Sequence, residues 1–199
     1  MDIHGKDRVE GVTIAQVDER RKPIAETREY IPCDTLLLSV GLIPENELSK
    51  SANVDISNIT NGAVVDQDRQ TSIDGVFACG NVLHVHDLVD FVSEEAEIAG
   101  KAAAEYINGH QNKGSQISVK TDGKIRYTVP HVITEKKDIT VYFRVSDVYK
   151  NVKINVTSGD NTLLVKKRPK VAPGEMESIT IKGEQLENVK ELKFSLEVL

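Results

Sequence analysis

The sequence of 199 residues lacks tryptophan, has only two cysteines, and is poor in aromatic residues, which make up 5% of the chain. Cys33 and Cys79 are far apart and form no C-x-x-C motif, so we expect neither a cysteine zinc site nor a neighbouring redox pair, but two reduced, packed thiols. No apolar run approaches the roughly 20 residues of a membrane span, and the N-terminus carries no signal-peptide pattern. These absences predict a cytoplasmic protein without a membrane span.

Charge is distributed unevenly along the chain. Residues 1–110 contain 20 Asp and Glu against 9 Lys and Arg, whereas residues 111–199 contain 11 against 16. The one tight basic cluster, Lys166-Lys167-Arg168-Pro169-Lys170, has no interleaved aromatics, which argues against nucleic-acid binding and favours either a solvated turn or an edge strand protected by lysines. The two halves therefore predict two different domains.

The first half has the pattern of an α/β protein. The segment TLLLSV, residues 35–40, is continuously apolar, which predicts a strand that is covered on both faces at the centre of a sheet. Further along, AVVD and VFACG are short strand candidates on either side of the turn signal SIDG. A helix is predicted next, with Asp90 as its N-cap and Gly109 just past its end.

The apolar positions of this helix indicate which side faces the protein interior. Their spacing of 4, 3, 4 and 4 residues predicts one buried stripe of small side chains, formed by Val92, Ala96, Ala99, Ala103 and Ile107. The charged residues Glu94, Glu95, Glu97, Lys101 and Glu105 are expected on the opposite, solvated side. The small stripe suits a close approach either to a sheet or to a ligand, and periodicity alone leaves both open.

The second half changes to a strand pattern after a polar linker at residues 108–116. Seven short strand-like runs lie between turn signals, and the third and the last alternate apolar and polar residues, as in Ile139, Val141, Phe143 and Val145. Seven strands over about 85 residues, each with one buried face, predict a small antiparallel β-sandwich of immunoglobulin-like type at residues 115–199. No catalytic constellation is present in it.

The order of motifs in residues 1–109 carries a family resemblance. A buried strand ending in VGLIP, the element Thr71-x-x-x-Gly75-Val-Phe77-Ala78-x-Gly80-Asn81, and a small-residue helix follow one another. This order resembles the C-terminal part of the FAD-dependent pyridine nucleotide-disulfide oxidoreductases. GNVLHVHDLVDFVSEEAEIAG is similar to the subgroup found with glycerol-3-phosphate dehydrogenases in anaerobic bacteria, whose members carry an extra β-rich C-terminal segment.

The resemblance implies a domain plan and a cofactor site. Residues 1–60 would be the end of the NAD(P)H domain and the crossover, residues 61–110 the C-terminal part of the FAD-binding domain, and residues 115–199 the added β domain. Gly80 would let the main chain approach FAD closely, because it has no Cβ. The other implied FAD contacts are Asn81, Val82, Phe91, Val92 and Ser93. Asn81 replaces the Asp of most members, so it can bind a ribityl hydroxyl without adding negative charge.

Two features of the family are missing from this sequence. It contains no G-x-G-x-x-G motif, whereas complete members have one for FAD and one for NAD(P)H, and it lacks the redox-active cysteine pair. We therefore expect the C-terminal fragment of an oxidoreductase that transfers hydride between NAD(P)H and flavin. Alone, it should be inactive and hold FAD weakly or not at all. Its catalytic residues are not identified by the sequence.

Several residues allow two interpretations. His84-x-His86 with Asp87 and Asp90 could bind a metal, but a solvated or flavin-flanking loop is favoured, so no metal is expected. Arg69 either faces water with its charged neighbours or reaches a phosphate. For the whole chain, the alternative function is a non-catalytic β-sandwich module that docks a partner dehydrogenase subunit. Open sheet edges could also pair between copies to give a homo-oligomer.

Overall fold

The computed structural model describes residues 2–39, 41–109, 114 and 116–199. The chain forms two compact units, Met1–Gly41 and Leu42–Leu199, and each is described by itself. Most of the predicted linker at residues 108–116 lies outside the described residues. The two units are mostly sheet with few helices, and no helix among the described residues is long and apolar enough to cross a membrane.

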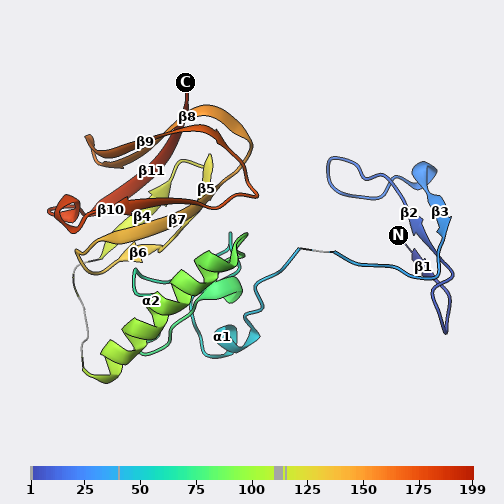
Figure 1. Ribbon diagram of the computed structural model, residues 1–199, viewed down its shortest axis with the longest axis horizontal. Coiled ribbons are helices and arrows are strands. Elements are labelled where there is room, and N and C mark those ends of the chain that lie inside the picture. The colour runs from blue at the N-terminus through green and yellow to red at the C-terminus, as the bar shows by residue number, and fades with distance from the viewer. Residues whose placement is uncertain (1, 40, 110–113, 115) are drawn as a thin grey trace. The chain divides into compact units, whose positions relative to one another are not determined.

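The first unit is a small antiparallel sheet of three strands in the order β1-β2-β3 (Figure 1). Its elements are β1 (Asp2–His4), β2 (Gly11–Ile14), the 3-10 turn η1 (Ala25–Thr27) and β3 (Glu29–Pro32). The predicted buried strand at residues 35–40 is wrong for the part that is described, because residues 35–39 form no strand and Leu37 is 90% exposed. An apolar run becomes a central strand only where neighbouring strands flank it, and among the described residues no strand pairs with residues 35–39.

The second unit begins with α1 (Glu47–Ser51), the 3-10 turn η2 (Gly80–Val82) and the long helix α2 (Val89–Ile107). The predicted helix is thus confirmed, and Gly109 follows it with a φ of 83°. The N-cap is Leu88 rather than Asp90, which lies in the first turn. AVVD and VFACG form only isolated bridges, Ile56 with Ala63 and Gln70 with Phe77, instead of strands.

The rest of the second unit is β-rich and forms two sheets. Its strands are β4 (Ile117–Thr121), β5 (Ile125–Val129), β6 (Val132–Ile133), β7 (Ile139–Val145), β8 (Tyr149–Ser158), β9 (Asn161–Val171), β10 (Glu177–Ile181) and β11 (Glu191–Val198), with the 3-10 turn η3 (Gly183–Leu186) before the last. One sheet has the order β10-β7-β5 and the other β6-β4-β11-β8-β9. All seven predicted strands are present, and β6 is an addition.

The two sheets share one hydrophobic core, in which Phe143 of β7 and Phe194 of β11 lie with their ring centroids 5.9 Å apart. The predicted inward residues of β7 are all buried. The expectation of purely antiparallel pairing is wrong for β4 and β11, which are parallel. The immunoglobulin-like type stays a prediction.

Helix α2 packs against the outer face of the smaller sheet. Tyr142, which the alternation placed on the wet face of β7, is only 3% exposed because the ring of Phe91 contacts it edge-on and Glu94 accepts its hydroxyl hydrogen bond at 2.8 Å. A second apolar cluster joins Val65 and Leu83 to Val129 of β5. The segment before α2 and the β-rich part therefore fold as one unit.

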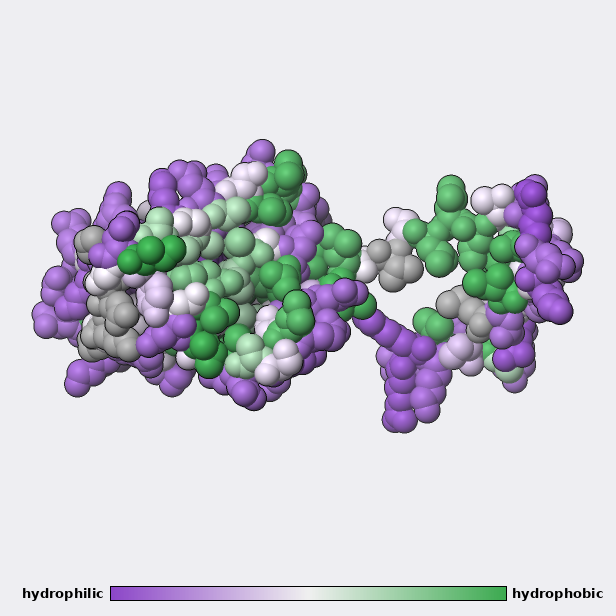
Figure 2. All heavy atoms as spheres, turned by 90° about the horizontal axis from the view of Figure 1, so that it is seen from below, coloured by the Kyte–Doolittle hydropathy of each residue, from purple (hydrophilic) through white to green (hydrophobic). Residues whose placement is uncertain are grey.

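Other apolar side chains of this unit remain exposed. They include Leu42, Ile43, Leu48, Ile59, Leu88, Val89 and Ile107. Figure 2 shows apolar surface between hydrophilic patches on the face of the larger unit that is seen from below. Leu88 and Val89 place some of this surface directly at the start of α2.

Candidate functional site

The chain turns sharply just before α2, and this turn builds the site. Gly80 has a φ of 73°, a left-handed conformation that side chains disfavour, and its carbonyl accepts hydrogen bonds from the N–H groups of Leu83 and His84. The side-chain oxygen of Asn81 then accepts the N–H of His86 at 3.1 Å. The turn thereby directs His84 and His86 toward the inner side of α2.

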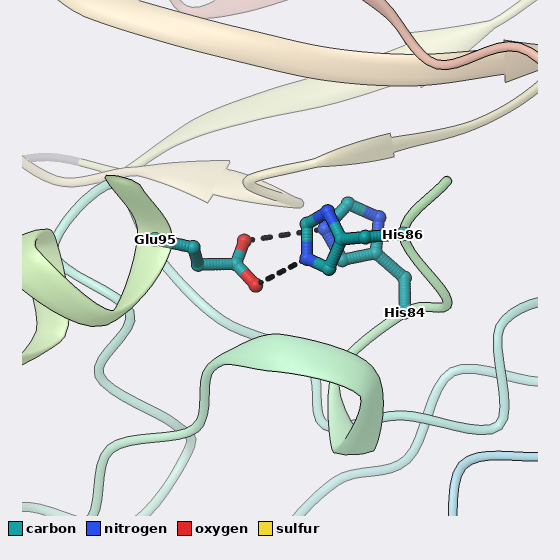
Figure 3. Close-up of side chains that lie close together, drawn as sticks. All are labelled: His84, His86 and Glu95. Atoms are coloured by element: carbon teal, nitrogen blue, oxygen red, sulfur yellow. Dashed lines mark hydrogen bonds and ion pairs between the residues drawn. The ribbon is translucent and has the colours of Figure 1, made fainter. Parts of the chain in front are cut away.

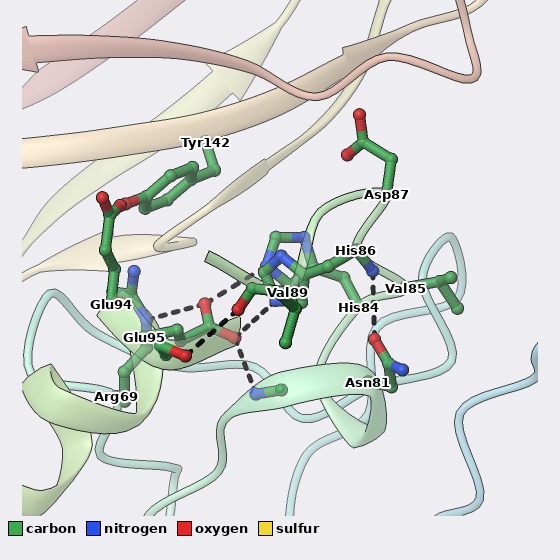
Figure 4. Close-up of polar contacts among 12 residues, drawn as sticks. Arg69, Asn81, His84, Val85, His86, Asp87, Val89, Glu94, Glu95 and Tyr142 are labelled. Atoms are coloured by element: carbon green, nitrogen blue, oxygen red, sulfur yellow. Dashed lines mark hydrogen bonds and ion pairs between the residues drawn. The ribbon is translucent and has the colours of Figure 1, made fainter. Parts of the chain in front are cut away.

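Glu95 lies at the centre of a buried polar cluster (Figure 3). Its side chain is completely buried and accepts hydrogen bonds from Arg69 Nε at 3.0 Å, the main-chain N–H of Gly80 at 2.8 Å, His84 Nε2 at 3.2 Å and His86 Nε2 at 3.0 Å. Figure 4 shows the same contacts together with the neighbouring residues. An ionised carboxylate only accepts, so both imidazoles carry their proton on Nε2 in this arrangement. We call Arg69, His84, His86 and Glu95 the Glu95 cluster.

Burial and hydrogen bonding set the protonation states of this cluster. Burial by itself raises the pKa of Glu95, but the hydrogen bonds from His84 and His86 and the charge of Arg69 outweigh it and hold that pKa far below its usual range. Burial lowers the pKa of His84 despite the neighbouring carboxylate. The cluster therefore contains a carboxylate, a guanidinium and a neutral His84 imidazole.

The surroundings of the cluster come from the β-rich part. His84 Nδ1 lies 3.3 Å from the hydroxyl of Tyr127 in β5, and the Arg69 guanidinium lies 5.9 Å from the ring centroid of Tyr142 in β7. Arg69 Nη2 and His86 Nδ1 are buried without a hydrogen-bond partner among the described residues. The cluster thus joins the segment before α2, α2 itself and the smaller sheet.

The sequence assigned two members of this cluster to the wrong environment. Glu95 was expected on the solvated side of α2, and Arg69 was expected to face water or a phosphate, but both are buried against each other. The buried stripe of α2 runs through Glu95, Ala99 and Ala102, whereas Ala96 and Ile107 of the predicted stripe are exposed. The sequence did contain a signal for the true buried face, because residues 95, 99, 102 and 106 also follow helical spacing and the last of them is the aromatic Tyr106.

The predicted FAD contacts lie in the turn η2 and in the first turns of α2. Asn81 is exposed, Val82 is half-buried in η2, and Ser93 is exposed with its hydroxyl donating to the Val89 carbonyl. Phe91 and Val92 are half-buried in the first turns of α2, where Phe91 contacts Tyr142. The structure brings these segments together, but whether they bind FAD stays a prediction.

Some of these residues fit a flavin dinucleotide and one fits less well. The side-chain amide of Asn81 is exposed, and the N-terminus of α2 has no side-chain cap, so its N–H groups suit a pyrophosphate, although Asp90 adds an opposing charge there. Gly80 uses its N–H for Glu95 and its carbonyl for the turn, and an added Cβ would lie 3.6 Å from Val92. Any contact of Gly80 with a cofactor would involve its Cα.

His84 and His86 do come together, but with Glu95 rather than with the acids that the sequence suggested. Asp87 accepts from Arg144 and from the Met176 N–H, and Asp90 is exposed. His84 and His86 also border a cavity of about 470 Å³ that is further lined by Arg126, Tyr127 and Arg144. Among the described residues, the two histidines and Glu95 form a group that could hold a metal ion.

The two cysteines are free and half-buried, and burial raises the pKa of the Cys79 thiol. Cys79 directly precedes Gly80, and its own unit, Leu42–Leu199, contains no second cysteine in the sequence. These properties fit the expected packed thiols better than a redox centre.

Comparisons with known proteins place this site in a family. Residues 2–105 match the family model of pyridine nucleotide-disulphide oxidoreductases, which is just over half of the chain. The thioredoxin reductase of Treponema pallidum (strain Nichols) is 31% identical over 55% of this chain and 33% of its own length. The ferredoxin--NADP reductase of Leuconostoc mesenteroides is 31% identical over 57% of this chain and 34% of its own.

A probable ferredoxin reductase of Castellaniella defragrans is 30% identical over 39% of this chain and 19% of its own length. The chain thus spans about a third or less of the curated relatives that it matches. No solved structure matches it.

Proposed function

Because the chain belongs to the pyridine nucleotide-disulphide oxidoreductase family, we propose that it acts as the C-terminal part of an FAD-dependent enzyme that transfers hydride between NAD(P)H and flavin. In this proposal residues 1–60 end the NAD(P)H domain, residues 61–110 complete the FAD site, and residues 115–199 form an added β domain in the cytoplasm. FAD would supply the redox chemistry, and the chain would bind and orient it.

One observation carries this proposal. Asn81 is exposed in η2, which contacts α2; its side-chain oxygen accepts the His86 N–H and leaves its NH2 group to donate, and the N-terminus of α2 has no side-chain cap. An amide suits a ribityl hydroxyl, and free N–H groups at the positive end of a 19-residue helix suit a pyrophosphate. The names of the relatives, thioredoxin reductase and ferredoxin--NADP reductase, support a reductase, and the second name supports the use of NADP.

Binding of FAD by this chain alone should be weak. No G-x-G-x-x-G motif is present in the sequence to hold the ADP half of the dinucleotide, so only part of the contact surface exists. The flavin absorbance of the purified chain tests this directly. A stoichiometric yellow protein would show that residues 1–199 suffice.

The location of the contact can be tested even if binding is weak. Titration of the isotope-labelled chain with FAD should shift the amide signals of Asn81 and of Val89–Ser93 in two-dimensional NMR spectra. Asn81→Ala should reduce these shifts, and Asn108→Ala, which changes an exposed amide at the other end of α2, should not. Shifts confined to other residues would contradict the proposed site.

The second candidate function rests on the open edge of the larger sheet. β9 is an edge strand of 11 residues, and edge strands offer unpaired main-chain groups to a partner. The lysines and the proline of residues 166–170 protect one half of this edge, so a partner strand would have to pair along residues 161–165. In this alternative the β domain docks a partner oxidoreductase, in the resembling subgroup a glycerol-3-phosphate dehydrogenase subunit, or a second copy of the chain. Gel filtration of the full chain, alone and mixed with that subunit, tests this alternative. An unchanged elution volume would argue against a docking module.

A further inference from the structure

We propose that His84, His86 and Glu95 bind one divalent transition-metal ion such as Zn²⁺, a site that lies outside the flavin chemistry proposed above. Their possible ligand atoms all lie within 4.8 Å of one another. His84 Nε2 is 3.2 Å from Glu95 Oε1, and His86 Nε2 is 3.0 Å from Oε2. Tetrahedral ligands at about 2.1 Å from a zinc ion lie about 3.4 Å apart, so small side-chain movements would open the site.

The hydrogen bonds of the cluster already direct the three side chains at one another. Both imidazoles point Nε2 at the Glu95 carboxylate. Zinc is bound by the unprotonated nitrogen of an imidazole. Coordination through Nε2 therefore requires that each ring carry its proton on Nδ1.

One histidine already has a partner for that second nitrogen. Metal-bound histidines usually donate their other N–H to a nearby acceptor, which fixes the ring. The Tyr127 hydroxyl lies 3.3 Å from His84 Nδ1 and can accept from it. Two histidines and one glutamate with a fourth position open to water are a donor set of catalytic zinc sites, and the cavity beside His84 and His86 provides room for that water.

Arg69 limits the affinity of this site. Its Nε lies 3.0 Å from Glu95 Oε1, so a dication and a buried guanidinium would together bring three positive charges, with only one carboxylate to offset them. Oε2 remains available because its other hydrogen bond comes from the uncharged N–H of Gly80. We therefore expect removal of the Arg69 charge to strengthen metal binding.

The experiment uses the full chain after treatment with a chelator. Titration with Co²⁺, followed by its visible absorption, should give one tetrahedral ion per chain that Zn²⁺ displaces. His86→Gln should weaken binding about tenfold or more, and Arg69→Met should strengthen it at least about tenfold. His4→Gln is the matched control, because His4 contacts Thr13 in the first unit, and should change nothing. Circular dichroism verifies that each variant is folded.

A hydrogen-bonded cluster without metal affinity would give other results. Three results would contradict the metal proposal. The folded native chain could fail to give the cobalt spectrum, or the native chain and His86→Gln could bind cobalt equally well. The third is cobalt binding that appears only after Arg69 is replaced. Flavin titration of the same samples is a separate readout, so failure of the FAD proposal and failure of the metal proposal are distinguishable.

Discussion

The carboxylate of Glu95 accepts the main-chain N–H of Gly80 at 2.8 Å, so a side chain from the second turn of α2 fixes the first residue of η2. This contact connects the buried cluster to the segment proposed to bind FAD. It also means that changes at Glu95 act on the turn as well as on the ion pair with Arg69.

Replacement of Glu95 by Gln should strongly destabilise the chain. The change leaves the guanidinium of Arg69 buried without its counter-charge, which typically costs about 3–5 kcal/mol of unfolding free energy. Urea unfolding followed by far-UV circular dichroism measures this. Glu97→Gln is the matched control on the same helix, since Glu97 is exposed and pairs with Lys101, and it should leave the midpoint nearly unchanged. Equal losses in both variants would contradict a structural role of the cluster.

The long elements could be predicted because local periodicity determines them. The strands of the β-rich part were predictable from alternation, and α2 was predictable from helical spacing. Both patterns depend only on residues that are close together in the sequence. Residues 35–39 show the limit of this reasoning, because an apolar run forms a central strand only if other strands flank it.

The cluster could not be predicted, because its contacts connect distant positions. Arg69 and Glu95 are 26 residues apart in the sequence. Either side chain, considered alone, is expected at the surface because single charges are rarely buried. Only the folded chain shows that each one provides the counter-charge for the other. The histidine pair was visible in the sequence, but its acidic partner was sought in Asp87 and Asp90 rather than on the helix.

Replacement of Gly80 by Ala tests whether the left-handed turn requires glycine. The added Cβ meets Val92 only at 3.6 Å, so the loss should come from the φ of 73° and amount to about 1–2 kcal/mol. Gly100→Ala should instead stabilise the chain by about 0.5–1 kcal/mol, because Gly100 lies inside α2 with no atom within 4 Å of an added Cβ. Opposite signs are expected in the same urea assay, and a loss at both positions would show that steric contacts dominate.

Removal of the Tyr142 hydroxyl tests the contact between α2 and the smaller sheet. Tyr142→Phe keeps the ring against Phe91 but deletes the hydrogen bond to Glu94 at 2.8 Å, which should lower the unfolding free energy by about 1 kcal/mol. The main-chain amides of α2 should exchange their hydrogens with solvent faster in this variant than in the native chain. Tyr149→Phe, which removes an exposed hydrogen bond to Ser146, should leave α2 unchanged. Unchanged exchange in Tyr142→Phe would show that apolar packing alone holds the helix.

The stability of the chain should decrease as the pH falls, in part through His131. Burial is the main reason that the pKa of His131 is lowered from 6.5 to about 4, and its ring accepts the Val65 N–H through Nδ1. Below pH 6.5 the unfolded chain therefore binds a proton that the folded chain excludes, so unfolding becomes easier between pH 6.5 and about 4. The full effect of this group is about 3 kcal/mol.

His131→Asn isolates this contribution, because an amide oxygen can still accept the Val65 N–H but does not titrate in this range. Urea unfolding at several pH values should show a shallower dependence for the variant. The two curves should lie closest above pH 6.5, and the native chain should lose stability relative to the variant as the pH falls toward 4. Parallel curves would mean that His131 is not the group responsible and that the acid sensitivity arises at another titrating group, such as His84 or Glu95.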